Sequence, residues 1–148
     1  MGPPAPPLPG RAVYRLLFLL AALDQLGWGL WALLRPDALL ALLRLPPLPV
    51  DLPPDRLQLC RLLGGLALAH VAFLAILVWR PERWGPYALV PLLGRALGTG
   101  LWLWAYGSDR LHLPAGPPLL LAAHDAVWLP VFAGFLIAWY RRAPRENA

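Results

Sequence analysis

Four long apolar stretches, separated by short segments rich in proline and arginine, dominate the sequence. They cover about residues 13–34, 58–79, 87–106 and 118–140. Each comes near the roughly 20 residues that a helix needs to cross a hydrocarbon core of about 30 Å. The pattern therefore predicts an all-α integral membrane four-helix bundle. Pro130 predicts a kink in the fourth helix, because proline has no N–H to donate to the carbonyl of Ala126.

The segments outside these stretches predict one transmembrane domain over residues 13–142, with a proline-rich disordered leader at 1–12 and a short tail at 143–148. In the first connection Asp37 can cap a turn, and apolar positions over 38–45 predict a short interfacial helix along the membrane surface. Two roles for this helix stay open. It is either a lid over the mouth of the bundle or a helix that only fills the interface.

The composition agrees with a lipid environment, since 59% of the residues are hydrophobic and 14% are charged, against about 25% charged in an average soluble domain. The net charge of +5 comes from arginines placed between the apolar stretches rather than along one stripe, so no nucleic-acid partner is expected. Seven arginines flank the two ends and the 80–86 loop, against four in the other two loops. By the positive-inside rule both termini are predicted to be cytoplasmic.

Four charged side chains lie inside the apolar stretches, where each needs a partner: Asp24, Arg61, Arg95 and Asp125. Depths reckoned at about 1.5 Å per residue predict that Asp24 pairs with Arg95 near the midplane and Asp125 with Arg61 in the outer half. Two acids and two arginines cancel. The charge balance therefore gives no reason for His124.

Helical periodicity predicts one inward stripe on each helix, carrying its charged residue. In the third stretch Arg95, Thr99 and Trp102 share such a side. In the second, Arg61, Gly65 and Ala69 step along a seam of small residues, which predicts close contact with a neighbouring helix.

Two histidines accompany these charges. His70 lies half a turn from Arg61 in projection, so we predict that it hydrogen-bonds a backbone carbonyl or faces another subunit. His124 is a quarter-turn from Asp125 and within reach of Trp128. Use of both histidines as axial haem ligands is disfavoured, because their predicted depths differ by about 8 Å.

The familiar motifs of soluble enzymes are missing. The sequence contains no GxGxxG before a helix, no GxxxxGK[ST], no CxxC, no HExxH and no GxSxG. Cys60 is the one cysteine, so neither an internal disulfide nor a cysteine-based metal site can form. No metal site is predicted.

Three segments together are similar to a known family. RPDALLALLRL after the first stretch, RLLGGLALAH at the start of the second and LLGRALGTGLW in the third resemble the DoxX-like small bacterial membrane proteins, in their four-helix branch of mostly unknown function. The resemblance covers about residues 11–142 and is carried by the short motifs R-x-x-G-G and G-R-x-x-G. It implies a bacterial inner-membrane protein. Because some relatives of DoxX are membrane subunits of quinone-linked oxidoreductases, it also implies a quinone or lipid-like ligand.

Three functions follow as alternatives. The first is a binding or accessory protein with a charged intramembrane pocket for a small amphipathic, lipid- or quinone-like ligand. The second is a membrane enzyme, an isomerase or quinone-linked oxidoreductase, in which His124 or Asp125 transfers a proton and a base stays free beside the substrate. The third is a structural subunit of a homo-oligomer or a larger complex. The candidate ligand-binding residues are Asp24, Arg61, Arg95, Thr99, Trp102, His124, Asp125 and Trp128.

Overall fold

The computed structural model describes residues 8–42, 54–108 and 116–142, and within these ranges the chain is helical, with no strand. The elements are α1 (Arg11–Leu34), α2 (Pro36–Leu42), α3 (Pro54–Trp79), α4 (Pro81–Trp84), the 3-10 helix η1 (Gly85–Ala88), α5 (Leu89–Gly107), α6 (Gly116–Ala126) and α7 (Leu129–Arg142). The all-α prediction is confirmed.

The helix bounds follow the predicted stretches closely, except that the fourth stretch is divided and that α4 and η1 precede α5. The fourth stretch is two helices, α6 and α7, which are separated at Val127 and Trp128. Pro130 is the second residue of α7, so the interruption falls where its missing N–H leaves the carbonyl of Ala126 without a helical partner. The short helix predicted over 38–45 corresponds to α2 as far as Leu42, and residues 43–45 lie outside the described part of the chain. Arg35 Nε lies 3.5 Å from Asp37 Oδ1, and this hydrogen bond lowers the pKa of the Asp37 carboxyl.

Three helical segments are long and apolar enough to cross a membrane, namely Arg11–Leu34, Cys60–Trp79 and Gly116–Arg142. Large apolar side chains on their outer sides stay uncovered, among them Leu16, 56% exposed, and Leu62, 69% exposed. So much apolar surface is characteristic of a protein solvated by lipid. These features indicate a multi-pass membrane protein. The fourth predicted span corresponds to α5, which is not among the three.

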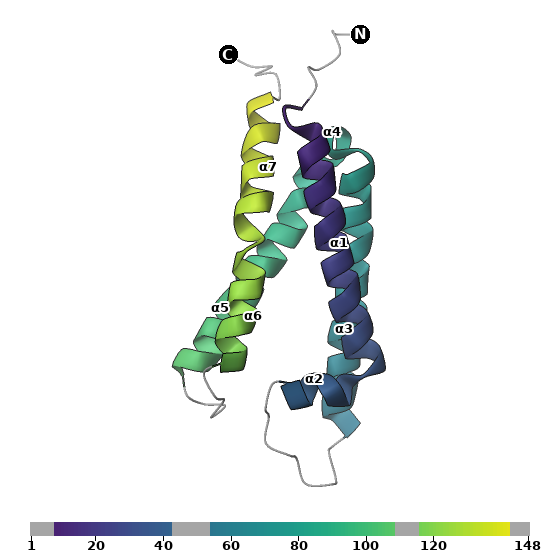
Figure 1. The fold of residues 1–148 in the computed structure, drawn as a ribbon, viewed down its shortest axis with the longest axis vertical. Helices are drawn as coiled ribbons and strands as arrows, with labels where there is room; N and C mark the ends of the chain where they lie inside the picture. The colour runs from purple at the N-terminus through teal and green to yellow at the C-terminus, as the bar shows by residue number, and fades with distance from the viewer. Residues whose placement is uncertain (1–7, 43–53, 109–115, 143–148) are drawn as a thin grey trace.

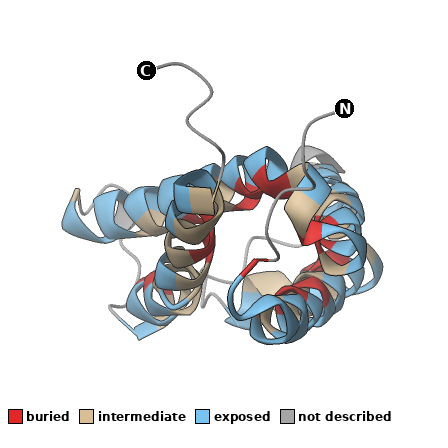
Figure 2. Ribbon diagram, turned by 90° about the horizontal axis from the view of Figure 1, so that it is seen from above, coloured by how far each residue is buried: buried red, intermediate tan, exposed pale blue. Residues whose placement is uncertain are grey.

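The helices form two pairs (Figure 1). In the first, α1 packs against α3; in the second, α5 packs against the interrupted helix formed by α6 and α7. The pairs lie together near the start of α1 and the end of α7, and they diverge toward α2 (Figure 1). Contacts within each pair are extensive, whereas those between the pairs are few in the part of the chain that the structure describes. Seen from above, the buried residues line the inward sides of the helices (Figure 2).

An apolar core closes the end where the pairs meet. Its largest fully buried side chains are Phe18, Leu74, Leu77, Phe132 and Phe135. At the same end, the indole of Trp139 donates to the carbonyl of Glu82 at 2.9 Å, and the Glu82 carboxylate pairs with Arg11 at 2.8 Å. This end therefore fixes how the two pairs are joined.

The contact between α1 and α3 uses a different face of α3 from the predicted one. Gly64 lies directly against the backbone of Gly29, and a Cβ at Gly64 would come within 2.8 Å of the Gly29 carbonyl oxygen. The predicted seam of Arg61, Gly65 and Ala69 is exposed instead. The prediction was wrong because α3 is apolar on all sides, so its pattern of apolar positions does not indicate an inward direction.

Candidate functional site

The side chain of Arg95 occupies the centre of a polar cluster between the two helix pairs. Arg95 is only 8% exposed. Its Nη1 donates to Asp125 Oδ1 at 2.6 Å, and its Nη2 donates to Asp24 Oδ2 and to Gln25 Oε1, both at 2.7 Å. One planar guanidinium thus binds two carboxylates and an amide at once, which the single ammonium of lysine could not do in this geometry.

The predicted pairing of Asp24 with Arg95 is confirmed, and that of Asp125 with Arg61 is wrong. Arg61 is exposed on α3, and Asp125 binds Arg95 instead. Gly98, one turn beyond Arg95 on α5, makes this approach feasible, because a Cβ at that position would collide with Asp125 Oδ2. Depth along each helix cannot reveal such a contact, since it depends on which helices are neighbours.

His124 completes the cluster. Its Nε2 lies 2.8 Å from Asp24 Oδ1, and its Nδ1 lies 3.4 Å from Arg95 Nη1 and 3.6 Å from Asp125 Oδ1. The short contact with Asp24 is satisfied when Nε2 carries the proton. Because Arg61 is not part of the cluster, two aspartates face one arginine, and protonation of His124 brings the formal charge to zero. A protonated His124 is therefore needed to balance the charge of the cluster, whereas the predicted pairing of Asp125 with Arg61 did not require it.

Two tryptophans enclose the cluster. The Trp28 ring meets the His124 ring edge to face, with the centroids 5.4 Å apart. Its indole N–H, 3.1 Å from His124 Nε2, can donate to that atom only in the tautomer that leaves Nε2 without a proton. The Trp128 ring lies at the interruption between α6 and α7, with its centroid 5.9 Å from the Arg95 guanidinium carbon. An aromatic face at this distance attracts a cation. Both rings thereby cover part of the cluster.

The cluster also joins the two helix pairs. Asp24 and Gln25 come from α1, whereas Arg95 comes from α5 and Asp125 from α6. Since few other contacts link the pairs away from the apolar core, these charge-assisted hydrogen bonds are a main connection at this level of the bundle.

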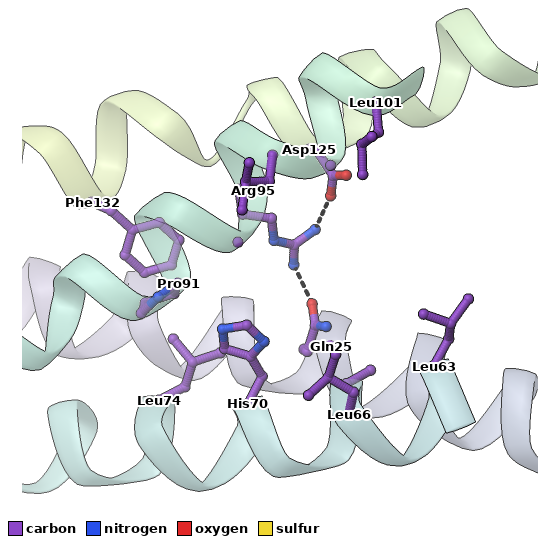
Figure 3. A pocket seen from close by; sticks show the side chains of 14 residues that line it. Gln25, Leu63, Leu66, His70, Leu74, Pro91, Arg95, Leu101, Asp125 and Phe132 are labelled. Atoms are coloured by element: carbon purple, nitrogen blue, oxygen red, sulfur yellow. Dashed lines mark hydrogen bonds and ion pairs between the residues drawn. The ribbon is translucent and has the colours of Figure 1, made fainter. Parts of the chain in front are cut away.

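A cavity of about 360 Å³ lies beside the cluster, between α3 and α5 (Figure 3). Arg95, Asp125 and Gln25 form its polar wall. Most of the remaining lining is apolar and includes Leu63, Leu66, Leu74, Leu97, Leu101 and Phe132. A second, shallower hollow, of about 310 Å³, exposes the other side of the cluster at Asp24 and Trp28.

The other predicted site residues lie at different places. Thr99 has a buried hydroxyl with no hydrogen-bond partner within the described residues, and neither it nor the half-buried Trp102 lines the cavity. Among the polar residues that line the cavity, Gln25 and His70 were not predicted as site residues. The sequence does contain a signal for Gln25, because this polar residue directly follows Asp24 in an apolar stretch.

His70 differs from its prediction. Its ring lines the cavity and packs against Gly94, rather than facing another subunit, and within the described residues its Nε2 has no hydrogen-bond partner.

The described residues contain no group of three or more His, Cys, Asp and Glu side chains that could hold a metal ion. In the polar cluster, the place between the carboxylates is taken by the Arg95 guanidinium.

No family model, curated protein or solved structure matches the chain.

Proposed function

We propose that this chain is a four-span membrane protein of the DoxX-like type, whose cavity binds a small amphipathic ligand of lipid- or quinone-like chemistry. The observation that carries the proposal is the cavity itself, which has a buried polar cluster on one wall and leucine and phenylalanine side chains on most of the others. Small-molecule sites commonly combine an apolar lining with a few placed polar groups.

Two features support α5 as the fourth span. It runs beside α6 on the way between the two ends of the bundle, and its Leu93 and Leu97 are 57% and 66% exposed. The start of α1 and the end of α7 lie at the same end of the molecule (Figure 1), as an even number of crossings requires. We place both termini on the cytoplasmic side of the inner membrane because of the arginine distribution.

The two motifs behind the DoxX-like assignment coincide with contacts that build the site. In R-x-x-G-G, Gly64 lies against α1. In G-R-x-x-G, Gly94 lies against His70, Arg95 is the centre of the cluster and Gly98 accommodates Asp125. The shared motifs therefore describe the packing that creates the cavity.

Binding is favoured over catalysis by the state of the carboxylates. Asp24 and Asp125 are both hydrogen-bonded to Arg95, and Asp24 is bonded to His124 as well. A proton-transfer mechanism needs a base that is free to reach the substrate. A carboxylate held by a guanidinium is a poor base, so we assign the cluster to ligand orientation and helix connection.

Filling the cavity should remove the ligand. Ala67 lines the cavity on α3, and Ala69, two residues on, is exposed and does not line it. We expect native mass spectrometry of the wild type and of Ala67→Trp and Ala69→Trp variants to show a lipid-sized adduct on the wild type and on Ala69→Trp. Ala67→Trp should lose at least nine tenths of it, roughly a tenfold loss of affinity. Equal adducts on both variants, or none on the wild type, would count against the proposal.

A further inference from the structure

His70 is the one buried group on the α3 side of the cavity, within the described residues, whose chemistry the polar cluster does not use. Its imidazole lines the cavity and points from α3 toward the side that carries Arg95 (Figure 3). Nε2 is buried without a hydrogen-bond partner in the part of the chain that the structure describes. Buried polar atoms are nearly always paired, so this one calls for an explanation.

The position of His70 is made by a glycine on the facing helix. A Cβ at Gly94 would come within 2.9 Å of His70 Cε1 and 3.3 Å of Nε2. The ring is therefore held against α5 at the wall of the cavity. Nε2 itself is covered in this position, and a small rotation of the ring would turn it toward an occupant. The neighbouring charged groups do not supply a hydrogen-bond partner for His70 Nε2, because Arg95 and Asp125 bind each other.

Gln25 supplies a second polar side chain at the wall of the cavity. Its Oε1 accepts from Arg95 Nη2 at 2.7 Å, which orients the side-chain amide and leaves its NH₂ as the donor on that side chain. Gln25 also lines the cavity (Figure 3). The groups that the cavity can offer to an occupant are thus a neutral amide donor and an imidazole nitrogen, which suit oxygen atoms of an uncharged headgroup.

The walls indicate where the occupant comes from. Leu63 and Leu66 on α3 are 55% and 62% exposed, and Leu97 and Leu101 on α5 are 66% and 63% exposed, although all four line the cavity. The cavity therefore opens sideways between α3 and α5. In a membrane-embedded bundle this opening faces hydrocarbon, so an apolar tail can stay in the lipid while the headgroup enters.

We propose that the cavity admits, from the bilayer, a lipid with a small uncharged headgroup that bears carbonyl or hydroxyl oxygens, and that His70 hydrogen-bonds one of these oxygens through Nε2. This assignment rests on the proposed binding function and adds its specificity-determining residue. An anionic headgroup is disfavoured, because Arg95 is already neutralised by two carboxylates.

The test uses a photoreactive short-chain ubiquinone, titrated onto the full chain in nanodiscs of phosphatidylethanolamine and phosphatidylglycerol. The variants are His70→Leu, which removes both ring nitrogens, His70→Gln, which keeps a polar group, and Leu62→Phe, a control on the exposed side of α3. Thermal unfolding without the probe is measured in parallel. Unlabelled short-chain ubiquinone and oleate serve as competitors.

For His70→Leu we expect the half-saturating probe concentration to rise about five- to tenfold, as for one lost hydrogen bond. The unfolding temperature without the probe should stay unchanged or rise, because an unpaired buried nitrogen is removed. His70→Gln should label within about twofold of the wild type, as should Leu62→Phe. Ubiquinone should compete and oleate should not.

The outcomes separate the two claims. Saturable labelling of the wild type with equal labelling of His70→Leu would overturn the role of His70 and leave the proposed function standing. A His70→Leu variant that is destabilised without the probe would show a structural role for the ring and would also overturn the assignment. Competition by oleate equal to that by ubiquinone would overturn the uncharged headgroup. Absence of saturable labelling on the wild type would contradict both claims.

Discussion

Replacing Arg95 with methionine is expected to lower the free energy of unfolding by about 3–5 kcal/mol, because it leaves two buried carboxylates without their cation. The side chains of Arg95, Asp24 and Asp125 are only 10%, 22% and 17% exposed, so solvent screens them little. The same substitution disconnects α1 from α5 where few other contacts join the helix pairs. Unfolding by SDS in mixed micelles, followed by circular dichroism, measures the change.

Two further variants make this result specific to the cluster. Adding Asp24→Asn and Asp125→Asn to Arg95→Met removes the unpaired charges and should restore most of the lost stability. Arg61→Met removes the arginine that is exposed on α3, and it should change the stability by no more than about 0.5 kcal/mol. A triple variant that is no more stable than Arg95→Met alone would contradict the account of the cluster.

A single methyl group at Gly98 is expected to have the second largest effect, a loss of about 1–3 kcal/mol. The added Cβ would collide with Oδ2 of Asp125 and lie 3.3 Å from its Cγ. Asp125 cannot move away without giving up its bond to Arg95. The same SDS titration reports the loss of stability.

Gly100 provides the matched control on the same helix. Nothing lies within 4 Å of a Cβ at Gly100. Gly100→Ala should therefore be neutral or stabilise the helix by up to about 1 kcal/mol, through helix propensity alone. In an Asp125→Ala background Gly98→Ala should lose its penalty, since the colliding carboxylate is gone. Equal effects of Gly98→Ala and Gly100→Ala in the wild-type background would contradict the close packing of α5 on α6.

The helices themselves could be predicted from the sequence because their signals are local. The ends of α1 and α3 at Leu34 and Trp79 follow from the proline and arginine that come after the apolar stretches, and Pro130 marks the interruption between α6 and α7. The orientation of α3 could not be predicted. Its apolar residues surround the helix, and two adjacent glycines, Gly64 and Gly65, offer equally small surfaces to a neighbour.

The candidate site could be predicted only in part for a related reason. Asp24 and Arg95 were paired correctly, because rare charges at similar depth in a membrane seek each other. The partner of Asp125 depended on α6 lying against α5, a tertiary fact that no spacing within one helix contains. The place of His70 in the cavity wall could not be predicted, because it depends on Gly94 across the cavity rather than on its own helix.

If the cavity between α3 and α5 binds an amphipathic lipid, the photoreactive ubiquinone should attach to the residues that line this cavity. After saturable labelling in nanodiscs, peptide mass spectrometry identifies the modified residues. We expect modification to concentrate on the lining residues of α3 and α5, such as Leu66 and Leu97, and to disappear in Ala67→Trp. Modification spread evenly over exposed residues such as Leu16 on α1 and Ile137 on α7, and unaffected by Ala67→Trp, would contradict it.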